Sequence, residues 1–360
     1  MTPVTTDPVT GHYQLDFLFD YGTFALNPSS AWELADVRNP MRDEARGTGW
    51  PYNAWDEAPP PAMAKWFADN HPNIITAHVC AGQDGQPYSG IKKGGSAASY
   101  AGSVDEVARL YTLLTGLGKI VKVAGVALVH GESDNGNASY SDYIQELQDD
   151  YDADLKAITG QTEDIPVFTT QPSAGYPTAL GSTSNIHEEM LEAAAANPLI
   201  KMVGPKYAVE YASGDFHLTP TGTRDMARLY ASKIYQHIIG NSVDSLYPLS
   251  VTKTSSTTIK AVMSQSGLSF DTSAWDSNHS VQNTEWASGK GFEVTDNTGK
   301  LSISGVSIAG DEVTVTVSST IGTSPRLAYA HNVDGDNKPR RGQLRVTGGD
   351  WCCHFDRAAV

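Results

Sequence analysis

The feature that most constrains the fold is an alternation of apolar runs and amphipathic segments between about Asn73 and Ile239. The apolar runs predict buried strands, and the segments between them show helical spacing. Continuous apolar strands separated by helices are typical of a parallel sheet that helices cover on both faces. Strands are expected at residues 73–80, 121–130, 165–170 and 200–203, and helices at 104–117, 140–158, 186–196 and directly after His217.

The sequence changes character after Asn241. Runs rich in Ser, Thr and β-branched residues follow at 250–262, 300–308 and 311–319, separated by turn residues. The stretch Val313 to Val317 alternates as a half-buried antiparallel strand does. We therefore predict an α/β domain over residues 1–243 and a β-sandwich accessory domain over 244–360. Residues 351–355 should close the second domain or return to the first.

Polar or glycine-rich clusters follow the predicted strands. Residues 81–85, 130–134 and 171–173 each come directly after an apolar run. Ligands of parallel α/β sheets bind outside the carboxyl ends of the strands, so these clusters should meet at one edge together with the His217 loop. That edge is the expected active site.

The loop at Asp215 and His217 carries an acid and an imidazole just before a helix. Thr219 suits the N-cap position and Pro220 the first helical position, so the helix should hold the histidine rigidly. A histidine near a carboxylate is the usual general base of a hydrolase. The alternative is a capped surface turn that contains a histidine.

The second cluster is His130-Gly131-Glu132-Ser133-Asp134. So many polar side chains directly after a buried strand have no packing rationale, which favours a functional loop. The alternative is an ordinary polar turn between a strand and a helix.

Together these blocks resemble the SGNH-hydrolase superfamily, and within it the sialate-O-acetylesterase-like carbohydrate esterases, including those of phage tails. The cluster 130–134 looks like that branch's Gln-Gly-Glu-Ser-Asp block, with His130 in place of the glutamine. Residues 82–85 look like its glycine block and residues 215–219 like its last block. The tail ending at Arg345 is similar to an accessory sandwich of such esterases.

The resemblance implies a three-layer α/β/α domain that removes acetyl groups from an acetylated polysaccharide. His217 would accept the proton of a serine and Asp215 would orient the imidazole. Gly85 and His130 would face the oxyanion, supported by Glu132 and Asp134. One departure concerns Asp215, because the family spaces its acid and base as Asp-x-x-His and Gly214 stands in that place here. A Ser-His dyad aided by a backbone carbonyl is the alternative.

The serine nucleophile is the larger departure, because residues 1–70 contain no strand followed by Gly-x-Ser. Three explanations stand. The block lies upstream of Met1; another residue substitutes, with Ser96 or Ser89 on a suitable loop and Asp84 in a faintly similar context; or the chain is a non-catalytic carbohydrate-binding or tail structural module. A lipid-acting enzyme is a weaker reading because the loops are polar.

Composition narrows the partners. A net charge of −16 without clustered Lys or Arg argues against nucleic acid and anionic membranes. No apolar run approaches a membrane span, and the amino terminus lacks the pattern of a signal peptide. No cofactor or metal is expected, since the zinc-like start at His187 has Leu191 where its second histidine belongs. An extracellular or virion-associated location is favoured over a cytoplasmic one, the oligomeric state is open, and Cys80 should be buried.

Overall fold

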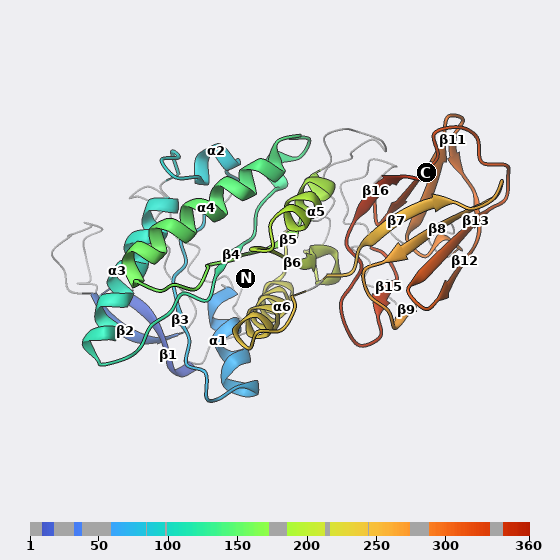
Figure 1. The fold of residues 1–360 in the computed structure, drawn as a ribbon. Helices are drawn as coiled ribbons and strands as arrows, with labels where there is room; N and C mark the ends of the chain where they lie inside the picture. The colour runs from blue at the N-terminus through green and yellow to red at the C-terminus, as the bar shows by residue number, and fades with distance from the viewer. Residues whose placement is uncertain are drawn as a thin grey trace. The chain divides into compact units, whose positions relative to one another are not determined.

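The computed structural model describes residues 9–17, 32–37, 59–83, 85–97, 99–172, 186–212, 217–243, 245–273, 288–331 and 341–360. Figure 1 shows its helices and strands. The chain forms two compact units. The first contains residues 1–127, 145–168 and 218–242, and the second contains residues 128–144, 169–217 and 243–360.

The first unit begins with strands that the sequence analysis did not predict. β1 (Val9–Phe17) pairs antiparallel with β2 (Trp32–Val37) and parallel with β3 (Ala77–His78), in the order β2-β1-β3. Strand β3 is shorter than the run predicted at 73–80. Cys80, expected to be buried, is only half-buried, because the structure keeps part of this segment accessible to solvent.

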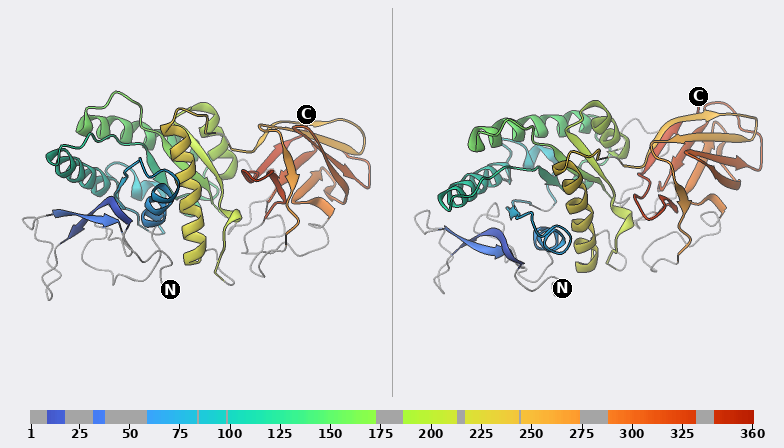
Figure 2. Two further views of the ribbon diagram at one scale, coloured as in Figure 1. Left: turned by 90° about the horizontal axis from the view of Figure 1, so that it is seen from below. Right: turned by 60° about the horizontal axis from the view of Figure 1, so that its bottom comes forward.

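Helices α1 (Pro59–Asn70) and α6 (Pro220–Ile238) lie side by side in the first unit, as both views of Figure 2 show. The ring of His71 stacks on Tyr235 with centroids 3.5 Å apart. The predicted start of α6 is confirmed: Thr219 is the N-cap, and its hydroxyl accepts a hydrogen bond from the Gly222 amide at 3.0 Å.

Helices α3 (Ser99–Gly116) and α4 (Tyr140–Thr159) correspond to the helices predicted at 104–117 and 140–158, whereas the short helix α2 (Tyr88–Ile91) was not predicted. Within the first unit, the Tyr100 hydroxyl of α3 donates to Asp154 of α4 at 2.8 Å, and the hydroxyls of Ser103 and Tyr151 are 2.8 Å apart. These contacts join the amphipathic faces of α3 and α4.

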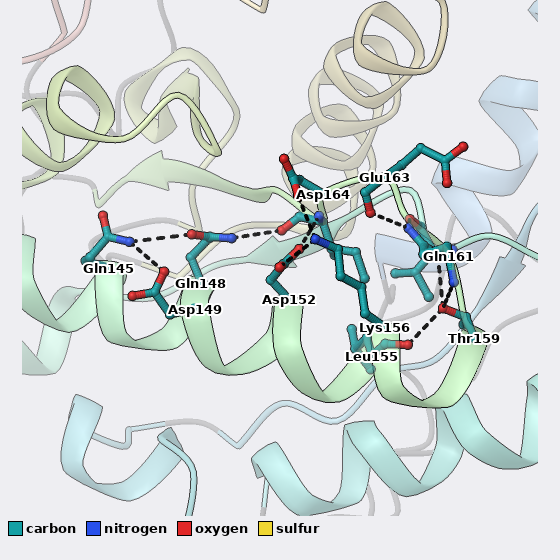
Figure 3. A network of polar contacts seen from close by, with 12 residues as sticks. Gln145, Gln148, Asp149, Asp152, Leu155, Lys156, Thr159, Gln161, Glu163 and Asp164 are labelled. Carbon is teal, nitrogen blue, oxygen red and sulfur yellow. Dashed lines mark hydrogen bonds and ion pairs between the residues drawn. The ribbon is translucent and has the colours of Figure 1, made fainter.

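A polar network fixes the segment between α4 and the next strand, β5 (Val167–Gln171) (Figure 3). Asp152 accepts from the Ile165 amide at 2.7 Å, while Gln148 donates to the Ile165 carbonyl at 3.2 Å. Lys156 bridges Asp152 and Asp164 at 2.8 and 2.6 Å. Both backbone groups of the buried Ile165 therefore have side-chain partners on α4.

The predicted parallel sheet is present in a shorter form. It has three strands in the order β4-β5-β6, with β4 at Val126–Leu128 and β6 at Ile200–Pro205. The run predicted at 121–130 is strand only from Val126, because Gly125 (φ +155) lies against Phe168, where a Cβ would come within 2.5 Å of the ring. β5 is buried throughout, whereas β4 is the partly exposed edge.

The second unit combines α5 (Ile186–Ala196) and β6 with antiparallel sheets. One sheet has the order β12-β13-β8-β7, another β11-β10-β14-β16, and β15 pairs with β9. In β13 every second residue is buried, which confirms the predicted alternation. The strands are β7 (Pro248–Lys253), β8 (Thr258–Met263), β9 (Leu268–Phe270), β10 (Phe292–Asp296), β11 (Gly299–Leu301), β12 (Ile303–Ala309), β13 (Glu312–Val317), β14 (Arg326–Tyr329), β15 (Leu344–Val346) and β16 (Phe355–Ala358).

The Gln171 amide ties the end of β5 to the segment before β16. Its Nε2 donates to the carbonyls of His187 and His354, each at 3.0 Å, and its Oε1 accepts from the His354 amide at 2.7 Å. Glu188 of α5 accepts from the Asp356 amide at 2.8 Å. The end of β5, helix α5 and the start of β16 are thus joined by buried polar contacts. None of the described helices is long and apolar enough to cross a bilayer.

Candidate functional site

The turn after β4 is the most completely defined part of the predicted site. Gly131 has φ +128, and a Cβ there would lie 3.4 Å from Met190 and from Pro172. Both the positive φ and the close neighbours favour glycine. Residues Glu132–Asp134 then form a short 3-10 turn, η1. The sequence His130-Gly131-Glu132-Ser133-Asp134 therefore encodes a tight reversal that leaves Ser133 exposed.

His130 is held inside this turn. Its Nδ1 lies 2.6 Å from the Tyr140 hydroxyl, and the two rings are parallel with centroids 5.8 Å apart. Its Nε2 is 3.7 Å from Oδ2 of Asp134. Both ring nitrogens thus face protein groups, and donation to an oxyanion by His130 remains a prediction.

Asp134 closes the turn. Its amide donates to the Gly131 carbonyl at 3.1 Å, and its Oδ1 accepts from Asn137 Nδ2 at 3.4 Å. The buried carboxylate therefore contacts both ends of the turn, His130 and Asn137. The supporting role that the sequence suggested for Asp134 remains a prediction.

Glu132 forms an ion pair with Lys206, which follows β6 in the 3-10 turn η2 (Lys206–Ala208). The Lys206 side chain is 9% exposed and that of Glu132 25%. Burial favours the neutral acid, but the Lys206 ammonium outweighs it and lowers the pKa of Glu132. Lys206 was missed by the sequence analysis, although the rule used for the other clusters applies to it, since it is a polar residue directly after a buried strand.

His217 is exposed, and its carbonyl accepts from the Ala212 amide at 2.9 Å. Asp215 lies outside the described residues, so the geometry between acid and imidazole remains a prediction. An exposed imidazole two residues before the N-cap of α6 is accessible to a substrate, as a general base must be.

Gly85 is exposed with φ +68, a conformation that favours glycine, and an oxyanion role for its amide remains a prediction. Ser96 and Ser89 are exposed, while Asp84 lies outside the described residues. Gly85, Ser89 and Ser96 belong to the first unit, whereas His130, Glu132, Asp134 and His217 belong to the second. The structure thus brings together His130, Glu132 and Asp134 among the predicted residues.

The second unit also contains three buried histidines, His187, His331 and His354. The ring of His187 is 4.4 Å from that of His354 and 6.2 Å from that of His331. His187 Nε2 donates to the Pro172 carbonyl at 3.0 Å, and His354 Nδ1 donates to the Ala330 carbonyl at 2.5 Å. In the described part of the chain, no group of three or more His, Cys, Asp or Glu side chains has the arrangement to hold a metal ion.

Burial controls the charge of these histidines. It lowers the pKa of His187 to about 3, with His331 adding to the effect, and burial together with Arg326 lowers that of His331 to about 4. Burial also lowers the pKa of His354 well below its ordinary value. The carboxylate of Glu132 acts in the opposite direction on His187. All three rings are neutral near pH 7.

Comparison with known proteins identifies a shared fold. No family model and no curated protein sequence matches the chain. A carbohydrate acetylesterase from Xanthomonas citri has a similar structure, with a TM-score of 0.62 and 13% identity over 99% of this chain and 74% of that one. A protein from Arabidopsis thaliana matches 66% of this chain and 85% of its own at 14% identity, but its TM-score of 0.43 is too low to carry an argument. The chain therefore has a mixed α/β fold like that of a carbohydrate acetylesterase.

Proposed function

We propose that this protein is a carbohydrate O-acetylesterase that removes acetyl groups from an acetylated polysaccharide. The observation that carries the proposal is the anchored turn His130–Asp134 at the carboxyl end of β4, in a fold similar to that of a carbohydrate acetylesterase. The exposed His217 supplies an imidazole that a substrate can reach. Polar loops and a strongly acidic chain suit an uncharged sugar ester better than a polyanion.

In the proposed reaction a serine attacks the acetyl carbonyl and His217 accepts its proton, then returns it to the departing sugar hydroxyl. Asp215 orients the imidazole and stabilises its charged form. The Gly85 amide and donors of the turn at His130 face the oxyanion, each contributing on the order of 3 kcal/mol. Water then releases acetate from the acetyl-serine, with His217 again as the base.

The serine itself is a separate part of the proposal. Ser96 is the candidate for it within the sequence. Ser96 is exposed, as a nucleophile must be.

The finer architecture belongs to the same proposal. It comprises an SGNH-type three-layer domain over residues 1–243 and a β-sandwich over 244–360, as in phage-tail and bacterial esterases. An extracellular or virion-associated location follows from a polysaccharide substrate. The antiparallel sheets of the second unit are compatible with such a sandwich.

The test is hydrolysis of p-nitrophenyl acetate and release of acetate from an acetylated polysaccharide by the full gene product. We expect turnover in the wild type and no turnover in His217→Ala. The control variant His237→Ala, in the last turn of α6, should keep the wild-type turnover. Absence of turnover in the full product would contradict the proposal. Glycan binding without turnover, unchanged by His217→Ala, would identify a binding or tail structural module instead.

A further inference from the structure

The ion pair between Lys206 and Glu132 links two loops across the carboxyl end of the parallel sheet. Glu132 follows β4 and Lys206 follows β6, and β5 lies between these strands. Strands two positions apart are about 10 Å apart, which is within reach of a lysine and a glutamate extended toward each other. The pair therefore fixes the turn at 131–134 relative to the last strand of the sheet.

Both partners are anchored at their backbones. The Tyr211 hydroxyl donates to the Lys206 carbonyl at 3.1 Å and is itself buried, so the start of η2 is fixed. On the other side, the packing around Gly131 and the Tyr140 contact of His130 fix the start of the turn. Lys206 thus joins two rigid segments, and its charge is placed with little freedom.

The charges matter as much as the linkage. His130 contributes to the lowered pKa of Glu132, and the Glu132 carboxylate partly offsets the lowering of the His187 pKa by burial. An unneutralised carboxylate in this turn would repel negative charge that develops on a substrate carbonyl beside it, in a partly buried site where such effects are large. The Lys206 ammonium cancels that repulsion.

We propose that Lys206 is a positioning residue of the acetylesterase site, which acts through Glu132 to hold and neutralise the turn that carries His130. This inference rests on the proposed function. It assigns to Lys206 no contact with substrate. Its effect is on kcat more than on KM, because both the geometry and the neutral charge of the turn matter most when the oxyanion forms.

The experiment compares Lys206→Met, Lys206→Arg, Glu132→Gln and the double variant Glu132→Gln/Lys206→Met in the full gene product. We expect Lys206→Met to lower kcat for p-nitrophenyl acetate by about 100-fold with little change in KM, as displaced catalytic groups do. Lys206→Arg should restore activity to within about 5-fold because it keeps the charge. The kcat of the double variant should exceed that of Lys206→Met by about 10-fold, since the second substitution removes the uncompensated carboxylate. Lys201→Met, on strand β6 that precedes Lys206, is the matched control.

A readout without turnover separates this inference from the proposed function. The ring resonances of His130, followed by NMR across pH, should shift in Lys206→Met and return in Lys206→Arg. Absence of turnover in the wild type would overturn the proposed function, and the NMR comparison would still decide the role of Lys206. Unchanged His130 resonances, or a Lys206→Met kcat within 2-fold of wild type, would overturn the inference. If Lys206→Met does not fold, Lys206→Arg alone decides. A change of the His130 resonances in Lys206→Arg, which keeps the charge, would then overturn the inference.

Discussion

The protein has two polar networks that differ in their exposure to solvent. The network on α4 in the first unit joins charged side chains near the surface, and Asp164 is 61% exposed (Figure 3). In the second unit, the Lys206 side chain is 9% exposed and the three histidines are nearly inaccessible. Exposed ion pairs contribute little to stability, whereas removing one partner of a buried pair leaves an uncompensated charge. The second unit should therefore determine how the protein responds to pH and to charge-changing substitutions.

The histidines should produce the largest effect. Their folded pKa values lie below the ordinary value near 6.5, so the unfolded state binds protons first as the pH falls. Stability is complete above pH 6.5 and is lost progressively toward pH 4. Between pH 7.5 and pH 5 each such histidine should lower the free energy of unfolding by about 2 kcal/mol. Urea unfolding at the two pH values measures the loss.

The variant His331→Gln identifies the source of this pH dependence. It should reduce the difference in the free energy of unfolding between pH 7.5 and pH 5 by about 2 kcal/mol, because one buried titrating ring is gone. His71→Gln, in the first unit, serves as the control. A difference that His331→Gln leaves unchanged would place the pH dependence elsewhere in the protein.

The variant Lys206→Met should have the next largest effect on stability, after that of the three histidines together. It leaves the Glu132 carboxylate without its ion-pair partner, and we expect a loss of about 3 kcal/mol at pH 7.5, at the low end for a buried pair because Glu132 keeps some exposure. Lys206 lowers the pKa of Glu132, so the pKa of Glu132 should rise in Lys206→Met. At acidic pH Glu132 can then take up a proton, and the loss of stability should be smaller. A loss below about 1 kcal/mol at pH 7.5 would show that water already screens the pair.

Asp152→Ala tests the first unit. It removes the acceptor of the Ile165 amide, so a buried backbone donor loses its partner at a cost of about 1 to 2 kcal/mol. Asp152→Asn keeps an acceptor oxygen at the same position and should recover most of the stability. Equal destabilisation by both variants would mean that the negative charge, and not the hydrogen bond, stabilises this segment.

Lys156→Ala should have the smallest effect. Its ammonium bridges Asp152 and Asp164 at the surface, where water and salt screen both pairs. We expect no resolvable change in the thermal unfolding midpoint in 0.15 M salt. A clear decrease would show that the network on α4 acts as a unit, and the contrast between the two units would then be weaker than proposed.

Local sequence signals predicted the helices well. The N-cap at Thr219 and the proline after it fixed the start of α6, and helical periodicity located α3, α4 and α5. The alternation at 313–317 predicted β13 for the same reason, since each signal depends only on near neighbours. The same alternation in β1, where Tyr13, Leu15 and Phe17 flank polar residues, was present in the sequence and was overlooked.

Features that depend on distant contacts were not predictable in this way. An apolar run does not reveal that β4 is an edge strand of the three-stranded sheet, or that β4 begins only after Gly125, which lies against Phe168. Lys206 and Glu132 are 74 residues apart, and no spacing rule pairs them. The sequence at His187 resembled the start of a zinc motif that lacks its second histidine. The rings that His187 contacts in the structure, His331 and His354, lie far from it in the sequence. Sequence patterns therefore singled out the turn at 130–134, and tertiary packing determined its partners.

The most direct test of the proposed esterase is covalent labelling of the full gene product with a fluorophosphonate, followed by peptide mass spectrometry. We predict that one serine is labelled, with Ser96 as the candidate within the sequence, and that His217→Ala prevents the labelling because the base that activates the serine is lost. Labelling that persists in His217→Ala, or acetate release without any labelled serine, would contradict a Ser-His mechanism.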